Sequence, residues 1–139
     1  EVVQFLQYEF QSKAISLNII NEFLNITILG KKNQLKQVFI NLFKNAIEAI
    51  NEDGSITLQV CKSKDGKEIY IQMIDTGCGI PPHVLERIFE PFYTTKTKGT
   101  GLGMMIINKI VQDHQGSIQI KSKQHVGTEI LLTFPIMTE

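Results

Sequence analysis

The sequence is organised around two glycine clusters, DTGCGI at residues 75–80 and KTKGTGLG at residues 96–103. The first follows the apolar run 68–74, which is typical of a buried strand, and the second precedes the apolar run 104–107, which opens a predicted helix. Glycines let backbone N–H groups approach a phosphate, and a helix N-terminus carries about half a positive charge. A carboxylate at a strand end, followed by glycines and lysines before a helix, therefore indicates a nucleotide site.

Size and composition indicate one globular domain in a reducing compartment. The length of 139 residues suits a single domain, and fourteen basic residues balance fourteen acidic ones, so charge does not indicate nucleic-acid binding. Cys61 and Cys78 provide neither a disulfide framework nor a metal-binding spacing, and no apolar run is long enough for a membrane helix. We therefore expect a cytoplasmic domain without membrane contact. Because Glu1 falls within a helical pattern, we expect 1–139 to be a fragment of a longer protein.

Hydrophobic periodicity predicts helices interleaved with antiparallel strand pairs. The predicted elements are helices at 1–14, 34–50, 83–89 and 103–114, strands at 16–23 and 25–29, and hairpins within 56–73 and 118–134. A lid is expected from 90 to 103, and Gly116 is expected to close the preceding helix at its C′ position. This pattern predicts an α+β two-layer sandwich, with a mixed, mostly antiparallel sheet covered on one face by three helices.

The helix predicted at 34–50 carries a second candidate site. Asn41, Asn45 and Glu48 are spaced i, i+4 and i+7, so their side chains share one face. Asparagine is a mediocre helix former, and two of them on one face of so apolar a helix need a reason. Either the face is a solvated polar stripe, or its amide and carboxylate oxygens are directed at a hard cation such as Mg²⁺.

Five short motifs in a fixed order resemble those of one protein family. They are an N box at 37–49 (QVFINLFKNAIEA), a G1 box at 75–80 (DTGCGI), an F box at 88–93 (IFEPFY), a G2 box at 99–103 (GTGLG) and Gly127-Thr128. Together they resemble the catalytic and ATP-binding domain of a two-component sensor histidine kinase, in the superfamily shared with gyrase, MutL and the heat-shock chaperone. The lid and N-box sequences are most similar to kinases of the sporulation or nitrogen-regulation type.

The resemblance implies ATP and Mg²⁺ as ligands and assigns roles to matching positions. Asn45 would be the Mg²⁺ ligand, with Asn41 near the phosphates or the waters of the metal. Asp75 would accept the adenine amino group, which suits a carboxylate that can only accept. Ile80 would pack on the base, and Thr128 would reach it directly or through water. The other residues assigned to the nucleotide site are Glu48, Ala49, Gly77, Gly79, Tyr93, Thr94, Thr95, Lys98, Gly99, Thr100, Gly101, Leu102 and Gly103.

Departures from the family pattern concern the catalytic residues. Gyrase-like ATPases carry a water-activating glutamate where this chain has Asn41, so we expect poor hydrolysis, as suits a phosphoryl donor. Many sensor kinases have an arginine where this chain has Thr94. Lys96 or Lys98 would then supply positive charge near the γ-phosphate, and the sequence does not distinguish them. Glu48 would either orient a metal-bound water or simply be solvated.

The phosphoacceptor histidine of such kinases lies on a separate helical hairpin, and His83, His114 and His125 do not fit its motif. The resemblance therefore implies a partner domain of the same protein that supplies the acceptor, a homodimeric parent that is membrane-anchored in some relatives, and a response regulator downstream. Two alternatives remain open. One is an anti-sigma-type serine kinase, against which Asn41 counts, and the other is a degenerate ATP-sensing module.

Overall fold

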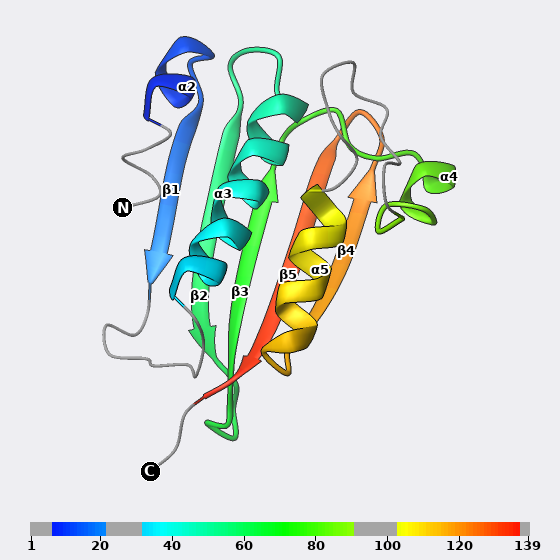
Figure 1. Ribbon diagram of the computed structural model, residues 1–139. Coiled ribbons are helices and arrows are strands. Elements are labelled where there is room, and N and C mark those ends of the chain that lie inside the picture. Colours follow the sequence, from blue (N-terminus) through cyan, green and yellow to red (C-terminus); the bar gives the residue numbers. More distant parts are fainter. Residues whose placement is uncertain (1–6, 22–31, 91–102, 137–139) are drawn as a thin grey trace.

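A computed structural model describes residues 7–21, 32–90 and 103–136, and every structural statement below concerns these residues (Figure 1). The elements are α2 (Gln7–Ser12), β1 (Ser16–Asn21), α3 (Lys32–Ala49), β2 (Ser55–Lys62), β3 (Glu68–Asp75), α4 (Pro82–Leu85), α5 (Gly103–Asp113), β4 (Ser117–Lys123) and β5 (Gly127–Pro135). The predicted strand at 25–29 and the predicted lid, apart from Glu90 and Gly103, lie outside these residues. None of the described helices is long and apolar enough to cross a membrane.

The strands form one five-stranded sheet in the order β1-β2-β3-β5-β4. β1 pairs with β2 in parallel, and the other three pairings are antiparallel. Both predicted hairpins are present, and the mixed, mostly antiparallel sheet is confirmed. β5 pairs with β3 as well as with β4, so the C-terminal hairpin adds to the sheet through its second strand (Figure 1).

Side chains that alternate along the strands build the core. On β3 and β5 the buried residues face each other in register, as Ile71 does with Leu132 and Met73 with Ile130. At the intervening positions both strands carry half-buried or exposed residues, which is the pattern of an antiparallel sheet with one covered face. The apolar face of the sheet therefore points towards the helices.

Three helices cover that face, as predicted. α3 and α5 lie side by side across the sheet (Figure 1), and α2 packs beside them through Phe10. The rings of Phe10 and Phe43 meet edge to face, with centroids 5.8 Å apart and planes at 86°. Burying each such ring contributes about 1.5–3 kcal/mol relative to leaving it exposed, so this contact fixes α2 against the middle of α3.

Two predictions about helix ends are wrong. The helix predicted at 83–89 is α4, which ends at Leu85, because the following N–H groups of Arg87 and Ile88 bond three residues back as successive turns. The helix α5 does not place Gly116 in the C′ conformation. Gln115 takes the left-handed backbone, with φ of 62°, and the N–H of Gly116 bonds to the carbonyl of Val111 at 2.9 Å.

Candidate nucleotide site

Segments that are far apart in the sequence come together at one end of the sheet, where β3 and β4 finish. The C-terminal end of α3, the end of β3, the start of α5 and the turn between β4 and β5 all lie towards this end, which is the upper one in Figure 1. Hydrogen bonds link these segments in pairs, from the loop after β3 to α3 and to the β4–β5 turn, and from α3 to α5. The predicted N box and G1 box and the first residue of α5 therefore share one region.

The loop after β3 is held against the last turn of α3 by Ala49. The N–H of Cys78 donates to the carbonyl of Ala49 at 2.9 Å. A Cβ added at Gly77 would stand 2.6 Å from the Cβ of Ala49, which is too close for two carbon atoms that are not bonded to each other. Glycine at position 77 is thus needed to let the loop touch the helix. The contact also gives Ala49 a structural role beside its predicted place near the nucleotide.

The other side of the loop rests on the β4–β5 turn. Gly79 has φ of 73°, and a side chain there would collide with the backbone of Lys123 and Gln124. The N–H of His125 donates to the carbonyl of Cys78 at 2.6 Å. The loop is therefore fixed from both sides, which sets the position of the carboxylate that precedes it.

Asp75 is a buried carboxylate at the end of β3, with 7% of its surface exposed. The N–H of Gly77 donates to its Oδ1 at 2.8 Å. Burial raises the pKa of Asp75 above the ordinary aspartate value, while the backbone hydrogen bonds from Gly77 and Thr128 act in the opposite direction. An acceptor that is buried and rigidly held is what recognition of an amino group requires.

Asp75 belongs to a polar row across three strands. In the sheet register Asp75 is opposite Thr128 on β5, and Thr128 is opposite Ser122 on β4. The hydroxyl oxygens of Ser122 and Thr128 are 2.8 Å apart, and the N–H of Ile80 donates to Ser122 Oγ at 2.7 Å. Ser122 was not among the residues predicted to form the site. In the sequence it is a hydroxyl residue in phase with Ile118 and Ile120, which lie on the inward face of β4, and this position could have indicated it.

The predicted metal-binding face of α3 lies beside α5. Asn41 and Asn45 are half-buried and Glu48 is exposed. The side-chain amide of Asn45 donates from Nδ2 to the sulfur of Met104, 3.1 Å away. The helix α5 begins one residue earlier, at Gly103, so the positive end of its dipole lies there. A Cβ added at Gly103 would meet no heavy atom of the described residues within 4 Å. On the side where that Cβ would stand, none of the described residues blocks this backbone.

The described residues do not form a metal site of their own. They contain no group of three or more His, Cys, Asp or Glu side chains placed to hold a metal ion. Mg²⁺ ordinarily keeps several waters and takes one or two protein oxygens together with the phosphates of a substrate. A single amide oxygen, that of Asn45, fits a Mg²⁺ ion that arrives with a nucleotide.

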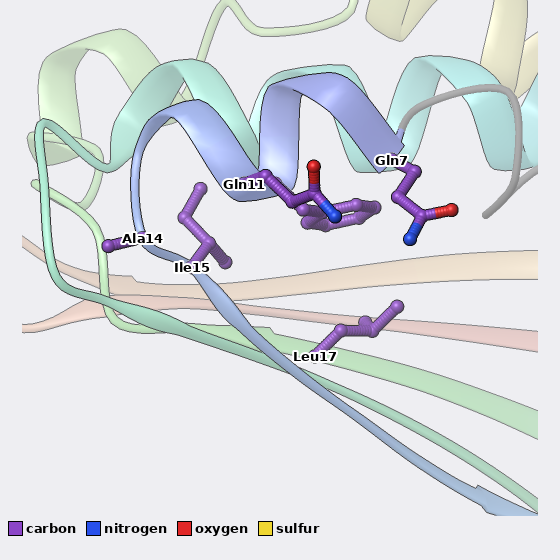
Figure 2. Close-up of a pocket in the computed structure, with 6 residues that line it drawn as sticks. Gln7, Gln11, Ala14, Ile15 and Leu17 are labelled. Atoms are coloured by element: carbon purple, nitrogen blue, oxygen red, sulfur yellow. The ribbon is translucent and has the colours of Figure 1, made fainter.

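A separate hollow of about 330 Å³ lies between α2 and β1, the edge strand on the side of the sheet away from β4 (Figure 2). It is lined by Gln7, Phe10, Gln11, Ala14, Ile15 and Leu17. It contains none of the predicted site residues.

Of the predicted site residues, contacts and sheet register bring together Ala49, Asp75, Gly77, Gly79, Ile80 and Thr128. Asn45 contacts Met104, the residue after Gly103, while Asn41 lies one turn before Asn45 in α3 and Glu48 is exposed. Nine others fall outside the described residues. They are Tyr93, Thr94, Thr95, Lys96, Lys98, Gly99, Thr100, Gly101 and Leu102.

Comparison of this sequence with known proteins shows the family to which the chain belongs. The family described as "Histidine kinase-, DNA gyrase B-, and HSP90-like ATPase" matches residues 30–138. The chain belongs to this family. The resemblance in its motifs is confirmed, and the ATPase domain is of the histidine kinase type, as the individual relatives show.

Relatives of this ATPase domain include sporulation kinases and sensor histidine kinases. Sporulation kinase A of Bacillus subtilis is 42% identical over 135 residues, which is 97% of this chain and 22% of that protein. The sensor histidine kinase ZraS of Escherichia coli K12 is 35% identical over 134 residues, which is 96% of this chain and 28% of that protein. The chain thus spans about a quarter of the length of the curated relatives it matches.

Solved structures confirm the α+β fold of this ATPase domain. The nucleotide-free catalytic domain of histidine kinase ThkA superposes with a TM-score of 0.85 at 31% identity, covering 96% of this chain and 87% of that one. Full-length ShkA, solved in complex with AMPPNP, gives a TM-score of 0.84 at 26% identity, covering 99% of this chain and 29% of that one. ThkA in complex with the response regulator TrrA gives 0.81 at 27% identity, covering 98% and 38%.

Proposed function

We propose that this domain binds Mg-ATP at the candidate site formed by the end of β3, the C-terminal part of α3 and the start of α5. It then donates the γ-phosphate to a histidine on another domain of the same protein. The observation that carries the proposal is the buried acceptor Asp75, held by Gly77 in a loop that also touches the helix of Asn41 and Asn45. Membership of the histidine kinase-like ATPase family and the AMPPNP bound by ShkA support ATP as the nucleotide.

Adenine recognition follows from the chemistry of Asp75. An ionised carboxylate accepts hydrogen bonds and cannot donate them, so it favours the 6-amino group of adenine over the 6-oxo group of guanine. A hydrogen bond to a charged group contributes about 1.5–3 kcal/mol, and an unpaired buried acceptor adds to the discrimination against the wrong base. Because Asp75 is buried, this discrimination is not weakened by competing water.

The phosphates would extend from the base towards α3 and α5. The positive end of the α5 dipole lies at Gly103, where an added Cβ would meet none of the described residues, and this suits a phosphate group. Mg²⁺ bound to the phosphates would neutralise charge during the transfer, and Asn45 would hold it through the amide oxygen. Asn41 lies one helical turn earlier, on the same face of α3, where it would meet the phosphates or the waters of the metal.

The transfer itself moves one phosphoryl group. The bond between the γ-phosphorus and the bridging oxygen breaks, a bond from phosphorus to a ring nitrogen of the acceptor histidine forms, and ADP departs with the electron pair. The imidazole proton passes to solvent or a base. At the position of Asn41 the chain offers an amide and no carboxylate, so water is not activated there and transfer is favoured over hydrolysis.

The whole protein is proposed to be a longer, homodimeric sensor kinase. Residues 1–139 would be its catalytic part, and a dimerisation domain would carry the acceptor histidine. A response regulator would receive the phosphate, since the related ThkA was solved with the response regulator TrrA. We propose a cytoplasmic location for this domain.

Phosphotransfer from labelled ATP tests the proposal. The domain is incubated with ATP labelled at the γ-phosphate, alone and together with the separately produced dimerisation domain of the parent protein. We expect no label on the isolated domain, and label on a histidine of the partner, recognised by a bond that acid cleaves and base does not. Label on serine, or no label despite ATP binding, would contradict the transfer to histidine.

A further inference from the structure

Ser122 sits at the end of the polar row Asp75–Thr128–Ser122 and contacts three groups. Its Oγ is 2.7 Å from the N–H nitrogen of Ile80, 2.8 Å from Thr128 Oγ1 and 3.1 Å from the carbonyl oxygen of Gly127. The first two distances are typical of hydrogen bonds, and the third is that of a long one. The side chain therefore joins the G1 loop, through Ile80, to the first two residues of β5.

Counting protons fixes the direction of each bond. A hydroxyl has one proton to donate and two lone pairs that accept. The N–H of Ile80 can only donate and the carbonyl of Gly127 can only accept, so the proton of Ser122 goes to Gly127. The remaining lone pair of Ser122 then accepts the proton of Thr128. Only this arrangement makes all three contacts hydrogen bonds.

The consequence falls on Thr128. Once its proton is directed at Ser122, the Thr128 oxygen can only accept from any other group. Thr128 is the cross-strand neighbour of Asp75, and both are 7% exposed. The row then presents two neighbouring acceptors, one charged and one neutral. Such a pair suits an amino group, which carries two hydrogens, or an amino group and its bridging water.

We propose that Ser122 is a positioning residue for base selection, which directs the Thr128 proton away from the nucleotide so that the pocket accepts a 6-amino purine and rejects a 6-oxo purine. The inference rests on the proposed binding of ATP and deepens it. Without the Ser122 hydroxyl, Thr128 is free to rotate and donate to a 6-oxo group. The N–H of Ile80 also loses its partner.

Binding of ATP and inosine triphosphate tests the inference. Inosine triphosphate differs from ATP in the 6-substituent and the proton on N1, so the ratio of the two dissociation constants reports selection at this position. Calorimetry compares the wild type with two variants, Ser122→Thr and Ser122→Val. Threonine keeps the hydroxyl, and valine has nearly the shape of threonine but lacks the hydroxyl. We expect Ser122→Thr to keep the wild-type ratio and Ser122→Val to lower it by about tenfold. Ser117→Ala, on the exposed face of the same strand, is the matched control.

The outcomes are distinguishable. A purely structural role would weaken both nucleotides equally, so an unchanged ratio in Ser122→Val would overturn the inference. If Ser122→Val does not fold, Ser122→Ala provides the comparison, and failure of both variants while Ser122→Thr folds would show a structural role and overturn it as well. Failure of the wild type to bind ATP would instead refute the proposed function.

Discussion

The side-chain amide of Asn45 donates to the thioether of Met104 across 3.1 Å, which ties the C-terminal part of the N-box helix α3 to the first turn of α5. A thioether is a weak acceptor, so the contact orients the amide more than it stabilises the fold. The amide nitrogen is engaged by Met104, and the amide oxygen is the atom of this side chain whose chemistry suits a metal ion. The groups proposed for metal and phosphate binding are therefore placed by the same contact.

Replacing Met104 with leucine should separate this orienting role from packing. Leucine conserves the volume but cannot accept the hydrogen bond, so stability should change by less than about 1.5 kcal/mol. We expect the affinity for Mg-ATP to fall about two- to fivefold, as suits the loss of a weak hydrogen bond. Met105→Leu, one residue along the same helix, is the control. Equal affinities for the two variants would show that the contact does not orient Asn45.

Burial of Asp75 should make the ligand-free domain less stable as pH rises. Its pKa is raised by burial, so the folded state holds the proton more tightly than the unfolded state. The stability that Asp75 contributes is complete below the ordinary value of about 3.9 and is lost as pH rises through the raised pKa. Asp75→Asn should therefore gain in unfolding free energy relative to wild type between about pH 4 and the higher pH at which Asp75 has ionised.

Urea unfolding across this pH range measures the difference between the two proteins. Asp65→Asn gives a control of opposite sign, because the hydrogen bond from Ser63 lowers the pKa of the exposed Asp65. Its carboxylate contributes stability that is present above the ordinary value and lost as pH falls. A difference for Asp75→Asn that stays flat or decreases with pH would contradict the assigned burial of a charged group.

Two glycines at the proposed site should respond differently to alanine. A Cβ at Gly103 meets none of the described residues, and alanine is the better helix former by about 1 kcal/mol in a helix interior. Gly103 is the first residue of α5, so little of this gain applies there, and Gly103→Ala should fold about as well as wild type. It should still weaken ATP binding, because the methyl group would occupy the proposed phosphate position. Gly127→Ala should unfold more easily, since its methyl would collide with the carbonyl of Asp75.

Thermal unfolding and ATP titration of both variants check this contrast. Unchanged ATP affinity in Gly103→Ala would remove the start of α5 from the phosphate site. A wild-type melting temperature in Gly127→Ala would show that the backbone there is not tightly packed.

Local patterns in the sequence predicted most of the elements. Strict alternation identified both hairpins, and the apolar stripe identified α3, because burial of one face imposes a period on the sequence. The sheet order was not predictable in this way. The pairing of β5 with β3 joins strands more than fifty residues apart, as between Ile71 and Leu132, and nothing local encodes it.

The sequence predicted which residues belong to the candidate site, but it did not predict the packing contacts that some of them make. The motifs located Asp75 and Asn45, because their chemistry is unusual at a strand end and on an apolar helix. The resemblance assigned Gly77 and Gly79 of the G1 box to the nucleotide site. The structure shows a packing reason for both, because Gly77 makes room for Ala49 and Gly79 makes room for the β4–β5 turn. Such contacts depend on tertiary packing. The hydrogen bonds of Ser122 to Thr128 and Ile80 likewise form only once β3, β5 and β4 are in register.

Titration of ATP into the wild type and Asn45→Ala, each with Mg²⁺ and with a chelator in its place, tests the central claim most directly. That claim is that the amide face of α3 and the loop after Asp75 bind one magnesium-bound adenine nucleotide. We expect Mg²⁺ to strengthen ATP binding to the wild type and to have little effect on Asn45→Ala, while the two proteins bind metal-free ATP alike and unfold at similar temperatures. Equal strengthening by Mg²⁺ in both proteins would contradict the claim.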